Sequence, residues 1–264
     1  MRPDSAHVPR KRFGQHFLHD PGILHRILDC VAPQRGEHLV EIGPGEGALT
    51  LPLLRAAGKL TAIELDRDLI EPLREKARGV GELTILNADV LTVDFSALAQ
   101  GTLMRIVGNL PYNISTPILF HCLNHAEAMA DMHFMLQKEV VERMAAAPGS
   151  KVYGRLSVML QLRCSVEPLL RVPPGAFRPP PKVDSAVVRL VPLPAAQLTD
   201  VNADLLARIV RAAFGQRRKT LSNALSGIAN ADDMTAVGID PRSRAEQLPA
   251  QAFVALARQL AARA

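Results

Sequence analysis

Apolar residues follow two different spacings along this chain, and each spacing predicts one kind of element. Short apolar runs that end in polar or turn-forming residues predict buried strands. The strands predicted in this way are residues 39–42, 60–66, 83–86, 106–109, 132–136, 156–164 and 186–191. Apolar residues three and four positions apart predict helices over residues 21–31 and 48–57, the first with Asp20 as its N-cap and Pro21 in its first turn.

The order of these elements divides the chain into two predicted domains. Strands alternate with helical segments up to about residue 193, which favours an α/β domain with an open parallel sheet over residues 1–193. Its first twenty residues, 1–20, are interpreted as a basic N-terminal arm. Residues 194–200 are interpreted as a linker. The helical spacing of residues 201–264 predicts a small all-helical C-terminal domain.

The strand that begins at Ile106 ends in Asn109, Leu110, Pro111 and Tyr112. Proline has no N–H and favours extended geometry in the residue before it, so the carbonyl of Leu110 is expected to be free to accept a hydrogen bond. Asn109 adds a second acceptor, and Tyr112 adds an aromatic face. Two acceptors beside a stacking surface suit a planar ring that bears an exocyclic amine, such as adenine. The alternative is that these residues merely end a strand.

A glycine-rich turn and two acidic residues occupy the ends of the preceding predicted strands. Residues 43–47 carry three alternate glycines between a strand and a helix, which lets the backbone approach a ligand closely. The acidic neighbours Glu41 and Glu46 favour a nucleoside with a cationic or zwitterionic tail over a pyrophosphate. Glu64 is placed to accept from ribose hydroxyls, and Asp89 from an adenine amine. Ligands of open parallel sheets bind at such strand ends.

Charge is distributed unevenly along the 264 residues. Lys and Arg exceed Asp and Glu by three over residues 1–36 and by four over residues 201–264, whereas the middle of the chain has a net charge of −2. This pattern favours a polyanionic partner held by both ends of the chain, with an ordinary solvated surface as the alternative. The candidate phosphate contacts are Arg10, Lys11, Arg12, Arg208, Arg211, Arg217, Arg218 and Lys219. The C-terminal group could instead interact with a helix dipole.

The cysteines Cys30, Cys122 and Cys164 are widely spaced and form no Cys-x-x-Cys motif. This favours a reducing compartment and argues against a disulfide framework or a zinc cluster. No apolar run approaches the length of about eighteen residues that a membrane span needs. A soluble cytoplasmic protein without a metal or a membrane partner is therefore expected.

Nine motifs in a fixed order make the chain resemble the class I S-adenosylmethionine-dependent rRNA adenine N6-dimethyltransferases, and among them the bacterial small-subunit (16S) rRNA enzymes. The motifs are residues 12–18, 41–47, 63–66, 87–89, 108–112, 134–140, 153–157, 177–185 and 214–220. The resemblance implies a Rossmann-like sheet that is mostly parallel with an antiparallel last strand, followed by a helical rRNA-binding domain. It also implies S-adenosylmethionine as the methyl donor, no metal, a monomer, and a role in small-subunit biogenesis.

By this resemblance, the enzyme transfers methyl groups to N6 of two adjacent adenosines in a loop near the 3′ end of 16S rRNA in the 30S particle. The implied cofactor-binding residues are His16, Leu18, Gly43, Gly45, Glu64, Asp89 and Asn109. The implied catalytic residues are Asn109, Leu110, Tyr112 and Phe177. Position 16 departs from the pattern, because the family usually has asparagine where this chain has His16. Phe177 could stack on the target base with Tyr112, or it could be a packed core residue.

Two other functions remain open at this point. A large-subunit (23S) rRNA adenine methylase of the antibiotic-resistance type shares the cofactor motifs, although less resemblance is expected through residues 214–220. A ribosome-assembly factor that binds the 30S particle without methylating it is the alternative from another class. The retained cofactor and acceptor residues argue against an inactive enzyme.

Overall fold

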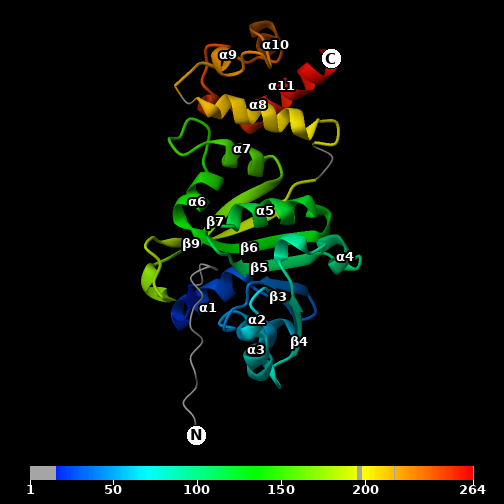
Figure 1. Ribbon diagram of the computed structural model, residues 1–264, viewed down its shortest axis with the longest axis vertical. Coiled ribbons are helices and arrows are strands. Elements are labelled where there is room, and N and C mark those ends of the chain that lie inside the picture. The colour runs from blue at the N-terminus through cyan, green and yellow to red at the C-terminus, as the bar shows by residue number, and fades with distance from the viewer. Residues whose placement is uncertain (1–15, 195–197, 217, 264) are drawn as a thin grey trace. The chain divides into compact units, whose positions relative to one another are not determined.

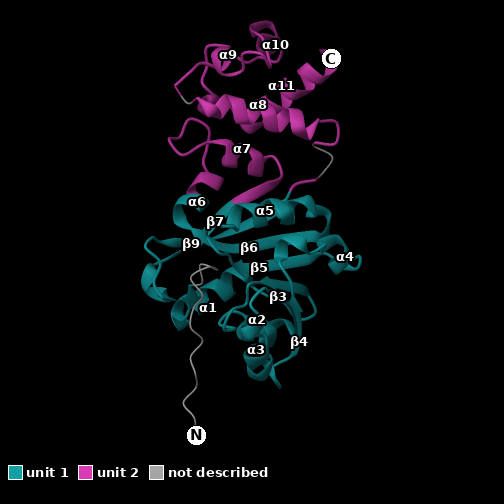
Figure 2. Cartoon of the chain, in the orientation of Figure 1, with its two compact units in different colours: residues 1–141, 167–192 teal, residues 142–166, 193–264 magenta. Residues whose placement is uncertain are grey.

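The computed structural model describes residues 16–194, 198–216 and 218–263. The chain divides into two compact units, shown in two colours in Figure 2. Unit 1 comprises residues up to 141 together with 167–192, and unit 2 comprises 142–166 together with 193–264. This division differs from the expected single boundary at residue 193, because residues 142–166 join the C-terminal helices instead of the sheet domain. Residues 1–15, most of the predicted arm, lie outside the described residues.

Figure 1 labels most of the helices and strands. The strands are β1 (Phe17–Leu18), β2 (His38–Ile42), β3 (Lys59–Glu64), β4 (Glu82–Asn87), β5 (Met104–Asn109), β6 (Met129–Gln137), β7 (Cys164–Val172), β8 (Phe177–Arg178) and β9 (Ser185–Pro192). The α-helices are α1 (Pro21–Val31), α2 (Thr50–Ala57), α3 (Ile70–Ala77), α4 (Phe95–Ala99), α5 (Ser115–Asn124), α6 (Lys138–Met144), α7 (Arg155–Gln161), α8 (Ala203–Gly215), α9 (Leu221–Ala224), α10 (Ala231–Ala236) and α11 (Ala250–Arg263). Short 3₁₀ turns lie between several of them, among them η2 (Arg67–Leu69) and η3 (Val90–Thr92).

Within the described residues, seven strands form one sheet in the order β4-β3-β2-β5-β6-β9-β7. Strand β2 runs parallel to β3 and to β5, β3 is parallel to β4, and β5 is parallel to β6. Strand β9 pairs with β6 in the antiparallel direction. The prediction of a mostly parallel sheet with an antiparallel last strand is therefore confirmed. The chain order reverses between β2 and β5, and ligands bind at such switch points in open α/β sheets.

Helix α1 has the ends that its sequence predicts. The side chain of Asp20 accepts a hydrogen bond from the N–H of Ile23 at 3.0 Å, and Pro21 occupies the first turn. Its buried residues Ile23, Ile27 and Val31 join a cluster with apolar residues of α2 and of the sheet. Burial of this stripe holds α1 on unit 1, because a short helix in water gains most of its stability from packing.

Residues 155–161 form a helix, α7, so the strand predicted over residues 156–164 is wrong. The alternating apolar residues favoured a strand, but Val158 and Leu162 also lie four residues apart and both enter the apolar cluster of unit 2. The N–H of Gly154 donates to the hydroxyl of Ser157 at 3.1 Å, which stabilises the first turn. Strand β7 begins afterwards, at Cys164.

Unit 2 is helical over the segment from residue 201 onward, as predicted. Its apolar cluster contains the buried stripe of α8, formed by Leu206, Ile209, Val210 and Ala213, together with Phe253 and Leu256 of α11. Asn202 caps α8 by accepting from the N–H of Leu205 at 2.9 Å. Over the described part of the chain, no helix is long and apolar enough to cross a membrane.

Candidate active site

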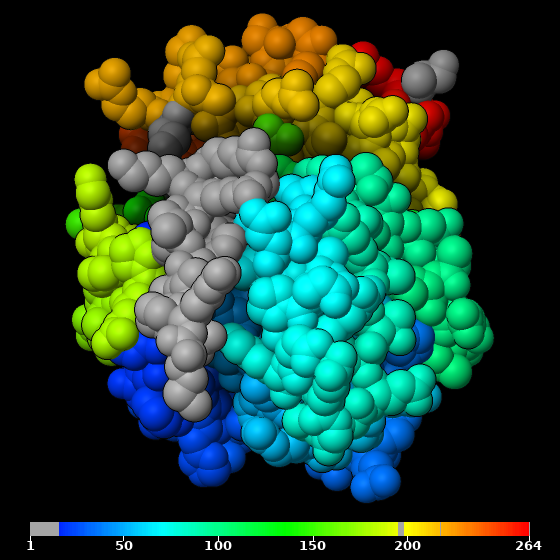
Figure 3. Space-filling view, turned by 60° about the horizontal axis from the view of Figure 1, so that its bottom comes forward, coloured from blue at the N-terminus to red at the C-terminus, as the bar shows by residue number. Residues whose placement is uncertain are grey.

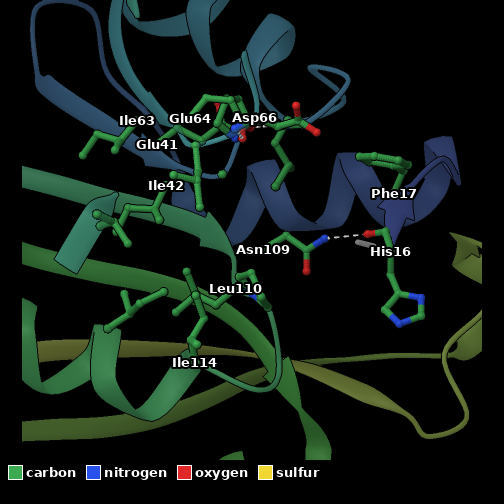
Figure 4. Close-up of a pocket in the computed structure, with 18 of the residues that line it drawn as sticks. His16, Phe17, Glu41, Ile42, Ile63, Glu64, Asp66, Asn109, Leu110 and Ile114 are labelled. Atoms are coloured by element: carbon green, nitrogen blue, oxygen red, sulfur yellow. Dashed lines mark hydrogen bonds between the residues drawn. The ribbon is translucent and has the colours of Figure 1, made fainter. Parts of the chain in front are cut away.

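A cavity of about 360 Å³ opens at the carboxyl ends of β2, β3, β4 and β5, beside the switch point. It is lined by nine of the ten predicted site residues: His16, Leu18, Gly43, Gly45, Glu64, Asp89, Asn109, Leu110 and Tyr112. Figure 4 shows how side chains from these strand ends converge. Figure 3 shows the segment around β8 (yellow-green) on the same face of unit 1 as the segment around β4 (cyan).

The glycine-rich turn after β2 gives the cavity its backbone wall. Gly43, Gly45 and Gly47 have φ angles of 67°, 56° and 88°, a region that side chains with a Cβ rarely adopt. A Cβ added to Gly45 would lie 3.0 Å from a ring carbon of Phe17. The turn therefore needs glycine both for its conformation and for the close approach of Phe17.

Glu64 is held at the end of β3 by two backbone donors. Its Oε2 accepts from the N–H of Gly45 at 3.1 Å and its Oε1 accepts from the N–H of Asp66 at 2.8 Å. Burial raises the pKa of Glu64, and the two N–H donors oppose this rise. A carboxylate oxygen can accept more than one hydrogen bond, so Glu64 retains capacity for hydroxyl donors in the cavity.

Glu41 is buried, with 2% of its surface exposed, and it lines the same cavity. Its Oε2 has no hydrogen-bond partner among the described residues. Burial raises the pKa of Glu41 to about 8, against a smaller opposing effect of Thr50, and the charge of Glu64 adds to the rise. An isolated buried carboxyl group is costly unless something compensates it. The pair Glu41 and Glu64 therefore makes this end of the cavity suited to cationic or hydroxyl-bearing ligands.

The side-chain amide of Asn109 has a defined orientation. Its Nδ2 donates to the backbone carbonyl of His16 at 3.0 Å, as Figure 4 shows. Because a carbonyl can only accept, the amide nitrogen must point to His16 and Oδ1 must point the other way. The carbonyl of Leu110 has no hydrogen-bond partner among the described residues, while its N–H donates to Met135 at 3.2 Å. Two acceptors are thus available side by side.

Tyr112 presents its ring beside these acceptors. Its hydroxyl shares a 2.6 Å hydrogen bond with the hydroxyl of the buried Ser185, and burial raises its pKa. The ring of His16 stacks on Tyr112 with centroids 5.7 Å apart and an interplanar angle of 26°. The Nδ1 of His16 lies 2.7 Å from the carbonyl of Pro179.

Phe177 is the predicted site residue that the structure does not bring to the cavity. Strand β8 pairs with β1, and Phe177 lies opposite Leu18 in that pairing. Its ring is 2% exposed and belongs to the apolar cluster of unit 1 with Val172 and Val187. Large aromatic rings gain most from such burial. Phe177 is therefore packed in the core and absent from the cavity lining in this structure, and its stacking on the target base stays a prediction.

Asp89 and Asp66 each begin a short 3₁₀ turn at the rim of the cavity. One carboxylate oxygen of Asp89 accepts from the N–H of Leu91 at 3.0 Å, and one of Asp66 accepts from the N–H of Asp68 at 3.2 Å. Asp89 is exposed, so its carboxylate can also reach a ligand amine. In the described part of the chain, no group of three or more His, Cys, Asp or Glu residues is arranged to hold a metal.

Comparison with known proteins identifies the family. The profile described as ribosomal RNA adenine dimethylase matches residues 6–262. The chain belongs to the ribosomal RNA adenine dimethylase family. Two proteins called ribosomal RNA small subunit methyltransferase A are similar to this dimethylase over 248 residues, 94% of its chain and 95% of each relative. They are 62% identical in Xanthomonas campestris pv. campestris (strain B100) and 63% identical in Xanthomonas axonopodis pv. citri (strain 306).

Two solved structures share the fold of this chain. A dimethyladenosine transferase from Plasmodium falciparum aligns with a TM-score of 0.80 and 28% identity, over 91% of this dimethylase and 96% of that chain. The 23S rRNA methyltransferase ErmE aligns with a TM-score of 0.71 and 26% identity, over 93% and 99% of the two chains. These likenesses confirm the Rossmann-like methyltransferase fold and the interpretation of the chain as an rRNA-modifying enzyme.

Sequence reasoning gave no role to two residues that shape the cavity of this dimethylase. Phe17 packs its ring against the glycine turn, although it lies inside a motif that the sequence analysis singled out. Glu41 appeared only as an acidic neighbour of that turn, whereas the structure shows it buried with an unpartnered oxygen. An acidic residue within an otherwise apolar strand was the available signal for Glu41.

Proposed function

We propose that this enzyme transfers methyl groups from S-adenosylmethionine to N6 of two adjacent adenosines in a loop near the 3′ end of 16S rRNA. Its substrate is the 30S particle, and the reaction contributes to small-subunit biogenesis. The observation that carries the proposal is the pair of acceptors, Asn109 Oδ1 and the Leu110 carbonyl, beside the ring of Tyr112 at the end of β5. The chain is proposed to act as a monomer in the cytoplasm.

The cavity suits the proposed methyl donor on chemical grounds. S-adenosylmethionine supplies an activated methyl group on a sulfonium and carries an ammonium, two ribose hydroxyls and an adenine amine. The buried, unpartnered oxygen of Glu41 and the neighbouring Glu64 fit a ligand with positive charge and hydroxyl donors. Gly43 and Gly45 leave room for close approach, Leu18 offers an apolar wall, and Asp89 and Asn109 offer polar contacts.

Asn109 and Leu110 are proposed to act on the amine of the target base. The amine of adenine is conjugated with its ring and is therefore a poor nucleophile. Acceptors for both N–H groups favour a more pyramidal nitrogen whose lone pair can attack. They also stabilise the positive charge that develops on that nitrogen. Because the released proton can pass to water, no general base and no covalent intermediate is required. Positioning would provide much of the remaining acceleration.

The basic residues of unit 2 are proposed to contact rRNA phosphates. Arg208, Arg211, Arg218 and Lys219 lie in or after α8, and the proposed partner Arg217 lies outside the described residues. Each lost phosphate contact should lower the logarithmic salt dependence of binding by roughly 0.7 to 0.9. An unchanged slope after triple alanine substitution of Arg217, Arg218 and Lys219 would remove them from the interface.

The proposal is tested by incubating the protein and radiolabelled S-adenosylmethionine with 30S subunits that lack dimethyladenosine, followed by nucleoside analysis of the rRNA. The expected product is labelled N6,N6-dimethyladenosine. We expect Asn109→Ala to lower the rate at least about a hundredfold, in the range seen when one preorganised polar contact to a developing charge is removed. Label on large-subunit rRNA alone would overturn the substrate assignment.

Glu64→Ala tests whether methylation and binding to the 30S particle can be separated, which distinguishes the proposed enzyme from a non-catalytic assembly factor. For the proposed enzyme, this substitution abolishes methylation through loss of cofactor binding and leaves 30S binding intact. A factor that acts mainly by binding would show no methylation even in the unaltered protein. The 62% identity to small-subunit methyltransferases, against 26% to the 23S enzyme, supports the small-subunit substrate.

A further inference from the structure

The side of the cavity that carries Asp89 belongs to a very short element. Asp89, Val90 and Leu91 line the cavity, and the last two are part of the 3₁₀ turn η3. Asp89 begins this turn, where its carboxylate accepts from the N–H of Leu91 and its backbone carbonyl accepts from the N–H of Thr92 at 2.9 Å. A single 3₁₀ turn gains little stability from its own hydrogen bonds, because their geometry is poor. The position of Asp89 therefore depends on what η3 is attached to.

A side chain of helix α5 holds the other end of this turn. The Nε2 atom of His121 lies 2.9 Å from the backbone carbonyl of Val93, the C-cap residue of η3. Because a carbonyl can only accept, Nε2 carries the proton and donates it. Ile118, one helical turn before His121, is buried and lines the cavity. The hydrogen bond thus joins η3 and α5, two elements that border the same cavity.

The ring of His121 is fixed from the side by two other rings. It packs against the fully buried ring of Phe95 with centroids 5.5 Å apart, and against the ring of His125 with centroids 5.3 Å apart. Tilted and edge-on contacts of this kind are favourable arrangements of aromatic rings. Since packing already restricts the rotamer of His121, its donation to Val93 costs little further side-chain entropy.

His125 provides a comparison within the same group of rings. Its Nδ1 lies 2.8 Å from the hydroxyl of Ser96 and 3.6 Å from a carboxylate oxygen of Asp94, the N-cap of α4. Among the described residues, neither of these partners lines the cavity or belongs to η3. The two histidines therefore share their packing at the end of α5, but they differ in what their nitrogen atoms bind.

We propose that His121 is a positioning residue for the methyl donor, because it holds η3 so that Asp89 meets the adenine amine of S-adenosylmethionine. This inference rests on the proposed function, since it assigns a residue to the binding of the proposed donor. His121 is absent from the cavity lining, so it acts through η3. A carboxylate that is held in place before binding gives a tighter complex than one that has to be ordered during binding.

The test measures the Kd of labelled S-adenosylmethionine for the full chain without RNA. His121→Phe keeps a ring beside Phe95 and removes the donor, and we expect it to raise the Kd about threefold to tenfold, the range of one hydrogen bond. His121→Gln removes the ring but keeps an N–H donor, the same number of bonds from the backbone as Nε2. Its Kd should stay within about twofold of that of the unaltered protein. His125→Phe is the matched control and should also stay within about twofold.

A change in the ligand separates positioning of Asp89 from a general loss of structure. The Kd values of S-adenosylhomocysteine and of its analogue whose purine lacks the amine are measured by competition with labelled S-adenosylmethionine. His121→Phe should raise the Kd of S-adenosylhomocysteine about threefold to tenfold and that of the analogue less than about twofold, because the contact it supports is missing from the analogue. Thermal unfolding shows that each variant is folded, and His121→Leu, which also lacks a donor, replaces a phenylalanine variant that is not.

Several results would overturn the inference. They are an unchanged Kd in the variant without a donor, an equal rise for S-adenosylhomocysteine and the analogue, a rise in His125→Phe as large as in His121→Phe, and a failure of His121→Gln to retain binding. An unaltered protein that binds no S-adenosylmethionine would overturn the proposed donor and this inference together. An unaltered protein that binds it but leaves small-subunit rRNA unmethylated would overturn the proposed substrate alone, and the Kd comparison would still decide the role of His121.

Discussion

Two buried carboxyl groups of the same sheet, Asp131 and Glu41, have opposite electrostatic surroundings. Asp131, near the start of β6, is bound by Arg105, with Nε to Oδ1 at 2.9 Å, and by Arg189, with an N–O distance of 3.1 Å. Glu41, near the end of β2, has one oxygen without a hydrogen-bond partner among the described residues and lies beside a second acid, Glu64. The protein therefore compensates the charge of Asp131 with arginine side chains and supplies no comparable cationic partner to Glu41 among the described residues.

The pKa values of the two groups follow from these surroundings. Burial alone would raise the pKa of Asp131, but the His133 ring at 3.6 Å and the guanidinium of Arg105 outweigh it and hold the pKa below its usual range. Burial raises the pKa of Glu41 to about 8. Asp131 has the properties of a structural ion pair, whereas Glu41 has the unpartnered oxygen and the raised pKa that are common at functional sites.

The largest effect is expected from Asp131→Asn, which keeps the shape of the side chain and removes its charge. Arg105, whose side chain is 14% exposed, would lose its main partner. Removal of one member of a buried pair costs about 3 kcal/mol or more of the free energy of unfolding. Chemical denaturation at neutral pH measures this loss, and methylation by the folded fraction should be retained. A loss below about 1 kcal/mol would show that Asp131 is not a structural charge.

The pH dependence of Asp131 provides a second check on the same variant. Because its folded pKa is depressed, its contribution to stability is present above the unfolded value of 3.8 and is lost as the pH falls through the folded pKa. Asp131→Asn should therefore flatten the acid side of the stability profile. An acid limb equal to that of the unaltered protein would contradict this account.

Glu41→Gln is expected to change the dependence of stability on pH above pH 4.5, whereas Asp131→Asn changes it on the acid side. Below the unfolded pKa of 4.5 the carboxyl of Glu41 is neutral in both the folded and the unfolded protein, and its burial costs little free energy. Between pH 4.5 and about 8 only the folded protein keeps this proton, so the free energy of unfolding falls as the pH rises. This slope approaches 1.4 kcal/mol per pH unit for one proton. The glutamine variant should lose the slope and be more stable than the unaltered protein at pH 9. Glu71→Gln, at a side chain that is 72% exposed, is the matched control and should keep the slope.

The smallest effect is expected from Arg189→Gln. The side chain of Arg189 is 42% exposed, so solvent screens its bond to Asp131, and exposed pairs contribute about 1 kcal/mol or less. Thermal unfolding in low and high salt should show a small loss that salt reduces further. A loss as large as that of Asp131→Asn would mean that Arg189, and not Arg105, is the principal partner.

Local spacing in the sequence determined much of the sheet and the placement of the cavity. Apolar runs ended by Gly43, Glu64 and Asn109 predicted strands β2, β3 and β5, and the carboxyl ends of parallel strands necessarily meet at one edge. The glycine turn and the Asn-Leu-Pro-Tyr stretch carry their chemistry in a few consecutive residues. Such features can be inferred from sequence because they depend on contacts within a short segment.

The tertiary structure alone decided the features that depend on pairing between distant segments. The orientation of the Asn109 amide is fixed by the carbonyl of His16, ninety-three positions earlier. The burial of Phe177 follows from the pairing of β8 with β1, and the helical state of residues 155–161 from packing in unit 2. The unpartnered oxygen of Glu41 is likewise a property of its buried surroundings. Spacing along the chain specifies which side chains an element presents, but only the assembled fold specifies what they meet.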